Sequence, residues 1–269
     1  MLSIANFYKY TKQLISIELH TTFLIELYNH LPVLYERPKM NKVIFYDFHN
    51  TLAYRHKYFT TSVILVLDRY ERGHAISHEH LLPYLQTGFP WLEPDKEYHH
   101  LKDPQKWWEN IYPVFINALK AVNFSTEKAE FYTKEARKIM TGPGYYTLFD
   151  DTLDSLKRAK EYGYRNIILS NHVPELPLMA EQLGLMKYVD ICISSANVGY
   201  EKPNIKIYEL ALKIADYPLN PWMIGDNYIA DYQGARTAGI KSILVRKSVD
   251  EKVELYSDDL KGALDIILK

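Results

Sequence analysis

Short apolar runs, separated by stretches with a helical period, make up most of the chain after residue 40. The first run, residues 43–46, is β-branched and aromatic and is followed at once by polar residues. This pattern is typical of a parallel strand buried on both faces. Comparable runs recur at residues 166–169, 191–193, 222–224 and 242–245. Strands that alternate with helices in this way predict an α/β fold with a doubly wound parallel sheet.

Two stretches between these runs have the spacing of crossover helices. Residues 151–162 carry apolar or small side chains at a helical period. Asp150 and Asp151 are placed to cap the start of this helix, and Gly163 to end it. Residues 205–214 repeat the arrangement. The core is therefore expected to be Rossmann-like.

The stretch from residue 55 to residue 141 shows long helical patterns without strand alternation, so an inserted α-helical cap domain is expected at 55–141. Residues 40–54 and 142–269 would then form the α/β core, and residues 1–39 an N-terminal extension. Met40 opens the clear pattern after a segment that ends in a helix breaker. Either Met40 is the true start, or the preceding segment is a helical arm that packs on the core.

Composition narrows the class of protein. Apolar residues make up 47% and charged residues 24% of the 269 residues, which is typical of globular chains. With 32 basic and 33 acidic side chains and no long block of one sign, nothing suggests a nucleic acid or membrane partner. The single Cys192 forms no internal disulfide, and no apolar run approaches the roughly 18 residues of a spanning helix. A cytoplasmic protein is expected, and its oligomeric state cannot be read from the sequence.

Three histidines lie close together in the expected cap, at positions 74, 78 and 80. They suggest either a metal site or the start of a helix. Ser77 and His80 stand at the two ends of a capping-type arrangement. Because no cysteine or second histidine pair lies nearby at a suitable spacing, the helix start is favoured.

Polar side chains follow four of the predicted strands. In chain order they are the run DFHNTL at residues 47–52, the pair Ser170 and Asn171, Lys202, and Asp226 with Asp231 five positions later. Ligands bind open α/β sheets at the carboxyl ends of the strands. These side chains are therefore expected to converge on one crevice.

Together these residue types suit a phosphate ester. Asp47 can attack phosphorus as an oxygen nucleophile, and Asp226 and Asp231 offer the hard oxygen ligands that Mg²⁺ prefers. Lys202 and Ser170 can neutralise and hydrogen-bond phosphoryl oxygens. Each residue alone has a commoner explanation as a cap or a turn, but the ordered set favours a site for phosphoryl transfer.

In this order the groups resemble the four motifs of the haloacid dehalogenase-like hydrolase superfamily, over about residues 41–247. The run GYEKPNIKIY at residues 199–208 is specific to that superfamily. The resemblance implies a Mg²⁺-dependent phosphatase that acts through an aspartyl-phosphate, with a type 1 helical cap that selects a small phosphorylated metabolite. It implies these roles: catalysis by Asp47, His49 and Lys202; phosphate binding by Thr51, Ser170, Asn171 and Lys202; and metal binding by Asp47, His49, Asp226 and Asp231.

One residue departs from the superfamily's pattern. Two positions after the nucleophile its phosphatases normally carry a second Asp that protonates the leaving group, and here the residue is His49. The His49 carbonyl can still bind a metal, and an imidazole with a pKa of about 6.5 can donate and accept the proton. A nearby Mg²⁺ would lower that pKa, so we expect weaker turnover of poor leaving groups than of aryl phosphates. Alternatively, His49 marks a protein that only binds phosphorylated ligands.

The expected cap is rich in aromatic side chains, at Trp91, Tyr98, Trp107, Trp108 and Tyr112. They either form a stacking surface for a nucleobase or sugar, for which Trp91 is the main candidate, or pack the cap helices together. Tyr54, Arg55 and His56 are expected to lie near a leaving group. His172 is either a loop residue or a substitute acid.

Other functions remain open besides the phosphatase. A 2-haloacid dehalogenase uses the same Asp47 against carbon without a metal, although retention of Asp226 and Asp231 argues for the metal. A regulatory protein would keep the phosphate pocket without turnover. A phosphotransferase would pass the phosphoryl group to an acceptor other than water.

Overall fold

The computed structural model describes residues 41–55, 58–142, 144–247 and 253–269. Residues 41–269 form one structural unit, and the fold below is that of this unit. The expected N-terminal extension, the two interpretations of Met40, and His56 lie outside the described residues. Among the described helices, none is both long enough and apolar enough to cross a lipid bilayer.

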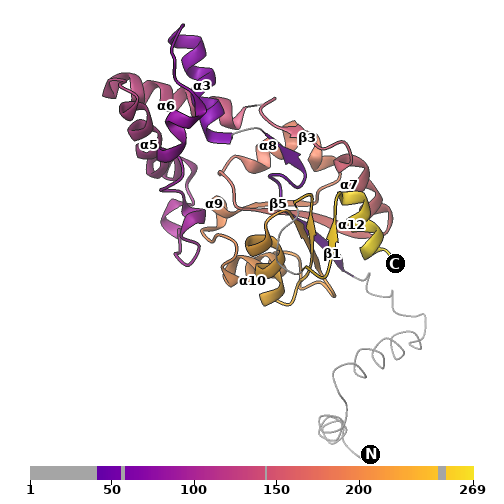
Figure 1. Cartoon of the computed structure of the whole chain (residues 1–269). Coiled ribbons are helices and arrows are strands. Elements are labelled where there is room, and N and C mark those ends of the chain that lie inside the picture. Colours follow the sequence, from indigo (N-terminus) through magenta and orange to yellow (C-terminus); the bar gives the residue numbers. More distant parts are fainter. Residues whose placement is uncertain (1–40, 56–57, 143, 248–252) are drawn as a thin grey trace, which may run out of the picture. The chain divides into compact units, whose positions relative to one another are not determined.

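A six-stranded parallel sheet forms the centre of the unit (Figure 1). Its strands, in spatial order, are β5 (Ile191–Ser194), β4 (Tyr164–Ser170), β1 (Lys42–Tyr46), β6 (Trp222–Gly225), β7 (Lys241–Val245) and β8 (Tyr256–Ser257). Every neighbouring pair is parallel. The five predicted strands are confirmed. The sixth, β8, was not predicted because two residues are too few to show a pattern.

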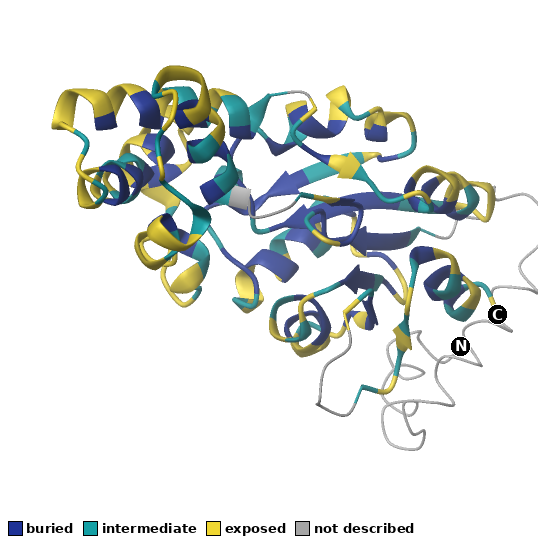
Figure 2. Ribbon diagram, turned by 45° about the horizontal axis from the view of Figure 1, so that its top comes forward, coloured by how far each residue is buried: buried dark blue, intermediate teal, exposed yellow. Residues whose placement is uncertain are grey.

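Alternate side chains of the strands are buried in different layers. On β1, Val43 and Phe45 pack in one apolar cluster with helices α10 (Ile205–Ile214) and α11 (Gly234–Thr237). Ile44 and Tyr46 pack in a second cluster, which contains α7 (Thr152–Glu161), α8 (Leu176–Gln182) and α12 (Leu260–Ile267). Figure 2 shows the buried strands between helices whose outer faces are exposed. This arrangement confirms the doubly wound α/β fold.

The predicted cap on helix α7 is wrong in one respect. Gly163, at φ +81°, does follow the helix end. Asp151 precedes the helix but makes no side-chain capping bond to it. Its carboxylate instead accepts hydrogen bonds from Arg246 Nη2 (2.6 Å) and from the backbone N–H of Leu260 (2.7 Å). Asp151 therefore ties the end of β7 to the start of α12, a long-range role that no local pattern reveals.

Helices occupy residues 58–141, as their periodicity predicts. They are α3 (Tyr58–Tyr70), α4 (His78–Leu81), α5 (Pro104–Ala121) and α6 (Thr126–Thr141), with 3₁₀ turns η1 (Leu82–Tyr84), η2 (Pro90–Leu92) and η3 (His99–Leu101). We call residues 58–141 the helical segment. A short antiparallel ribbon of β2 (Ala53–Tyr54) and β3 (Thr147–Leu148) lies where the chain leaves and rejoins the sheet. The exact domain boundaries stay a prediction.

Several long-range hydrogen bonds hold the helical segment against the α/β part. Glu175, which directly precedes α8, accepts hydrogen bonds from Trp108 Nε1 (2.9 Å) and Arg137 Nη2 (2.9 Å). The Tyr98 N–H donates to the carbonyl of Gly199 over 2.8 Å. The last contact places the start of η3 beside the segment between β5 and α10.

The three clustered histidines have three different partners. The Ser77 N–H donates to His80 Nδ1 over 3.0 Å at the start of α4, which is the expected capping arrangement. His74 Nε2 lies 3.1 Å from Asp68 Oδ1, and His78 Nδ1 lies 2.5 Å from the Thr60 hydroxyl. Each ring therefore serves the local packing of helices α3 and α4.

Candidate active site

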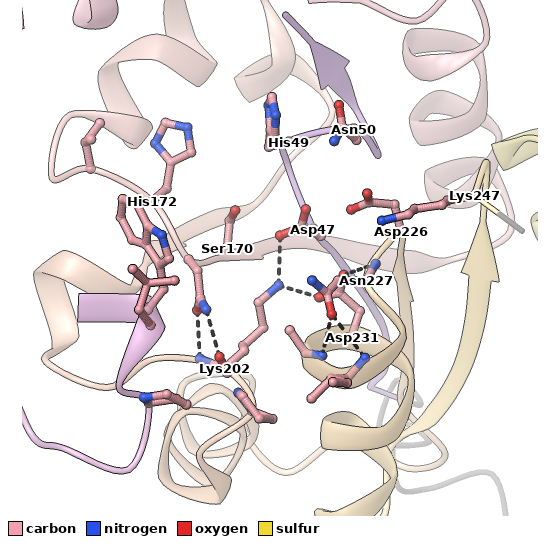
Figure 3. A pocket seen from close by; sticks show the side chains of 18 of the residues that line it. Asp47, His49, Asn50, Ser170, His172, Lys202, Asp226, Asn227, Asp231 and Lys247 are labelled. Carbon is pink, nitrogen blue, oxygen red and sulfur yellow. Dashed lines mark hydrogen bonds and ion pairs between the residues drawn. The ribbon is translucent and has the colours of Figure 1, made fainter. Parts of the chain in front are cut away.

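The carboxyl ends of β1, β4 and β6 open into a cavity of about 650 Å³ (Figure 3). This volume lies within the range of roughly 300–1,000 Å³ that is typical of small-molecule sites. Seven of the eight predicted site residues line the cavity: Asp47, His49, Ser170, Asn171, Lys202, Asp226 and Asp231. Asp47 and Asp231 are 184 positions apart in the sequence. They meet because the carboxyl ends of parallel strands lie at one edge of the sheet.

Three carboxylates form the acidic part of the cavity. Asp47, Asp226 and Asp231 each offer an oxygen atom, and these atoms lie within 4.8 Å of one another. Burial, together with the neighbouring Asp47 carboxylate, raises the pKa of Asp226 to about 6. Burial raises the pKa of Asp231 to about 7, against the opposing effect of Lys202. A cluster of this kind fits a hard divalent cation such as Mg²⁺, since its oxygen ligands lie close together and a cation would relieve their repulsion.

Lys202 is the positive charge at the centre of the cavity. Its Nζ donates hydrogen bonds to Asp47 Oδ1 (2.8 Å), Asp231 Oδ1 (2.5 Å) and the carbonyl of Leu169 (2.9 Å). Burial alone would lower the pKa of Lys202, but the carboxylates of Asp231 and Asp47 outweigh it and raise the pKa. Lys202 is therefore held protonated.

Asn171 fixes the backbone that carries Lys202. The Asn171 Nδ2 group donates to the Lys202 carbonyl over 2.8 Å, and the Lys202 N–H donates to Asn171 Oδ1 over 2.7 Å. The side-chain amide is therefore engaged at both ends. Ser170 and Asn171 both line the cavity, and their contacts with a phosphate stay predictions.

The turn after β6 presents Asp226 and Asp231 together. The Asn227 side chain accepts hydrogen bonds from the N–H groups of Ile229 (3.0 Å) and Ala230 (2.8 Å). The Asn227 N–H donates to Asp231 Oδ2 over 3.0 Å. A Cβ atom at Gly225 would overlap the Asp231 carboxylate, so only glycine leaves room for this approach. Asn227 is a site residue that the sequence analysis missed, although it directly follows Asp226.

Two histidines and a tyrosine form the wall opposite Lys202. The rings of His49 and Tyr146 are in edge contact, with centroids 5.9 Å apart. The Tyr146 hydroxyl lies 3.1 Å from His172 Nε2. Burial lowers the pKa of His49, although Asp47 opposes the effect. Burial and the neighbouring His49 lower the pKa of His172 to about 3, so His172 is a neutral, buried part of the cavity wall. His172 lies in the loop between β4 and α8, which confirms the loop interpretation, and its lowered pKa does not favour a role as an acid.

Some predicted residues do not reach the cavity. The Thr51 side chain is fully buried and is not among the lining residues, and its contact with a phosphate stays a prediction. Arg55 donates through Nη1 to the Tyr145 carbonyl over 3.3 Å. Neither Arg55 nor Tyr54 lines the cavity.

The aromatic residues of the helical segment divide into two groups. Trp107 and Trp108 are almost fully buried in the apolar core, as the packing interpretation predicts. Trp91 alone of the five predicted aromatics lines the cavity, together with Phe59, Leu92 and Pro94. No sequence pattern marked Phe59, Leu92, Pro94 or Tyr146 as site residues. The one signal for Lys247 was its position just after a predicted strand.

The fold and this constellation define a hydrolase with an acidic, lysine-containing site at the carboxyl edge of an α/β sheet. Residues 41–239 match the family model described as haloacid dehalogenase-like hydrolase. The chain therefore belongs to the haloacid dehalogenase-like hydrolase family, as the sequence motifs suggested.

Individual relatives are more distant. The chain is 30% identical over 148 residues to human haloacid dehalogenase-like hydrolase domain-containing protein 3, a match that covers 55% of this chain and 58% of that one. It is 34% identical over 120 residues to the glyceraldehyde 3-phosphate phosphatase of Methanothermobacter thermautotrophicus, which covers 44% of this chain and 52% of the relative. The chain thus spans about half the length of the curated relatives it matches.

Solved structures share the fold. A crystal structure of 2-haloacid dehalogenase from Pseudomonas syringae pv. Tomato DC3000 superposes with a TM-score of 0.59 at 16% identity, covering 84% of this chain and 98% of that one. At this identity the likeness extends to the fold alone.

Proposed function

We propose that this protein is a Mg²⁺-dependent phosphatase of small phosphorylated metabolites. The observation that carries the proposal is the meeting of Asp47, Asp226 and Asp231 within 4.8 Å, beside a buried lysine. A metal-free carbon displacement needs no such group of carboxylates, whereas binding a phosphate ester beside a carboxylate nucleophile does. The phosphatase among the relatives supports the same choice.

Asp47 is suited to act as the nucleophile. One carboxylate oxygen is held by Lys202 over 2.8 Å, and Figure 3 shows the other oxygen pointing away from that lysine. In the first step this oxygen forms a bond to phosphorus while the bond from phosphorus to the leaving oxygen breaks. In the second step water attacks phosphorus, and the bond to Asp47 breaks to release inorganic phosphate.

Asp47, Asp226 and Asp231, with the His49 carbonyl, are the groups proposed to hold Mg²⁺. Bound there, Mg²⁺ would neutralise phosphoryl oxygens that otherwise repel an incoming carboxylate. Lys202 adds a fixed positive charge on the same side, and Ser170 offers a hydroxyl to the phosphoryl group. Positive charges would thus lie around the position that the negatively charged phosphoryl group would occupy.

His49 is the residue proposed to move the proton. It stands two residues after the nucleophile and lines the cavity. It would give its proton to the leaving oxygen in the first step and take one from water in the second. Because burial lowers its pKa, less of the acid form exists at neutral pH than for an ordinary imidazole, and alkoxide leaving groups would depart more slowly.

The test is release of inorganic phosphate from a panel of aryl, sugar and nucleotide phosphates, with Mg²⁺ and with a chelator. Asp47→Asn is the active-site variant, and Asp154→Asn, an exposed residue of α7, is the matched control. We expect Mg²⁺-dependent release that Asp47→Asn abolishes and Asp154→Asn leaves unchanged. Halide release from a 2-haloacid in the presence of chelator, without phosphate release, would overturn the proposal in favour of a dehalogenase.

A further inference from the structure

The cavity has a charged end and an apolar end. Of the charged residues that line it, Asp47, Asp226, Asp231 and Lys247 follow strands or lie in the turn just after one, and Lys202 lies in the loop before α10. The helical segment contributes Phe59, Trp91, Leu92 and Pro94 to the lining, and none of these described residues carries a charge.

The aromatic part of this wall is stacked before any ligand arrives. The rings of Phe89 and Trp91 are 4.8 Å apart and inclined by 10°, and the rings of Phe59 and Phe89 are 4.5 Å apart and inclined by 17°. Phe89 is itself buried, and Trp107 supports Trp91 from within the segment, with ring centroids 6.2 Å apart. Phe59 and Trp91 face the cavity as a result. Such a wall can stack against a flat ligand without first losing much side-chain freedom.

The cavity has further apolar lining residues besides those of the helical segment. Ile229 and Ala230, from the turn after β6, line it, as does Val173, which follows β4. Ile229 is 60% exposed. Contact with an apolar ligand would remove part of this apolar surface from water, which favours binding. A ligand group that contacts Trp91 therefore finds further apolar side chains in the lining of the same cavity.

We infer that the leaving group of the substrate has a flat, aromatic or otherwise apolar face and carries no further negative charge. This inference rests on the proposed function, because the phosphoryl group is assumed to occupy the charged end beside Asp47. A carboxylate or a second phosphate on the leaving group would lose its hydration against Trp91 and Leu92 without gaining a cationic partner there. The substrate class is thus an aryl or arylalkyl monoester rather than a phosphorylated acid or a bisphosphate.

The direct test measures binding rather than turnover. Calorimetric titrations of the full chain with Mg²⁺ would use three phosphonates, whose carbon–phosphorus bond resists hydrolysis: benzylphosphonate, methylphosphonate and phosphonoacetate. We expect benzylphosphonate to bind at least about tenfold more tightly than methylphosphonate, and phosphonoacetate no more tightly than methylphosphonate. Phosphonoacetate binding as tight as that of benzylphosphonate, or no measurable binding of any of the three, would overturn the inference.

Two variants, Trp91→Ala and Leu92→Arg, localise the effect, and Tyr84→Ala is their control. Trp91→Ala is expected to weaken benzylphosphonate binding about tenfold and to leave methylphosphonate binding unchanged. Tyr84→Ala, which removes a 44% exposed aromatic of the helical segment outside the cavity lining, should change neither. Equal weakening of both phosphonates by Trp91→Ala would contradict stacking on this wall.

The second variant, Leu92→Arg, changes a 50% exposed residue and so puts the fold at little risk. Its guanidinium should raise phosphonoacetate affinity about tenfold relative to methylphosphonate. No gain would count against a leaving group at this wall.

Turnover separates this inference from the proposed function. If benzylphosphonate binds selectively but no ester is hydrolysed, the apolar end is supported and the phosphatase is not. If Mg²⁺-dependent hydrolysis is found and it favours phosphoglycolate over benzyl phosphate, the phosphatase is supported and the apolar leaving group is overturned.

Discussion

Lys202 Nζ lies 2.8 Å from Asp47 Oδ1, and both side chains are almost completely removed from solvent. A buried charge pair of this kind stabilises the folded protein only while both partners are present, because removal of one leaves the other charge without compensation. Here the lysine also contacts Asp231, so a single ammonium group compensates two carboxylates. The catalytic constellation and the stability of the fold therefore depend on the same residue.

Lys202→Met should consequently lower both activity and stability. We expect the free energy of unfolding to fall by about 3 kcal/mol, within the roughly 3–5 kcal/mol range of broken buried pairs. Urea unfolding measures this loss, and phosphate release should fall by at least about 100-fold. Lys213→Met removes an exposed lysine from α10 and is the control for the loss of charge. Equal stability of the two variants would mean that the buried lysine adds nothing to the fold.

Mg²⁺ should stabilise the folded protein in a pH-dependent way. The pKa values of Asp226 and Asp231 are raised to about 6 and about 7, so protons compete with the cation for these carboxylates as the pH falls through that range. Mg²⁺ at about 100 times its dissociation constant should add about 2.7 kcal/mol. Thermal unfolding with and without Mg²⁺ should show a larger rise in midpoint at pH 8 than at pH 5.5.

The matched variant for this prediction is Asp226→Asn, which removes one proposed ligand. The Mg²⁺-induced rise in midpoint should nearly vanish in this variant and should persist in Asp154→Asn. A rise of the same size at both pH values, or in Asp226→Asn, would contradict the assignment of these carboxylates.

His49→Asp should increase turnover of esters with poor leaving groups. A carboxyl group at this position restores the acid that the family's phosphatases normally carry, whereas the buried imidazole of His49 has a lowered pKa. We expect kcat for an alkyl phosphate to rise about tenfold or more, with a smaller change for an aryl phosphate. His49→Ala is the comparison that removes the proton carrier altogether. No gain on alkyl phosphates in His49→Asp would count heavily against a proton-transfer role for this position.

Glu201 should make the stability of the protein fall at alkaline pH. Its side chain is 1% exposed, and its Oε2 atom has no hydrogen-bond partner among the described residues. Burial raises the pKa of this carboxyl to about 8, against the smaller effects of Ser195 and Lys202. The folded state therefore binds the proton more tightly than the unfolded state. The resulting stabilisation is complete below the ordinary pKa of about 4.5 and is lost as the pH rises through about 8.

Glu201→Gln carries a neutral side chain at every pH and tests this prediction. Urea unfolding from pH 5 to 9 should show stability that declines with pH in the native protein and declines less in the variant. At pH 9 the variant should be the more stable of the two. Parallel pH profiles would show that Glu201 ionises normally in the folded protein.

The strand ends were the part of the site that the sequence could predict. Asp47, Ser170 and Asp226 follow apolar runs that are readable without a structure, and parallel strands bring their ends to one edge. The reach of individual side chains was not readable in this way. Thr51 turns into the interior although it lies four residues after Asp47, and Asn171 turns to the Lys202 backbone.

Contacts between distant segments were the other limit. Tyr146 enters the cavity from the return of the chain after the helical segment, and no periodicity marks that position. Asp151 shows the same limit, because its partners Arg246 and Leu260 are about a hundred residues away. Two-residue strands such as β2 and β3 are too short to produce a pattern at all.

The side-chain amide of Asn171 joins two loops that are separate in the sequence. It accepts from the N–H and donates to the carbonyl of Lys202, so two hydrogen bonds hold the loop after β4 to the loop before α10. A substitution of Asn171 would remove both bonds and so loosen the loops that carry the hydroxyl of Ser170 and the ammonium group of Lys202. Redesign of one loop for a new substrate therefore has to carry the other loop with it, as a single exchangeable block.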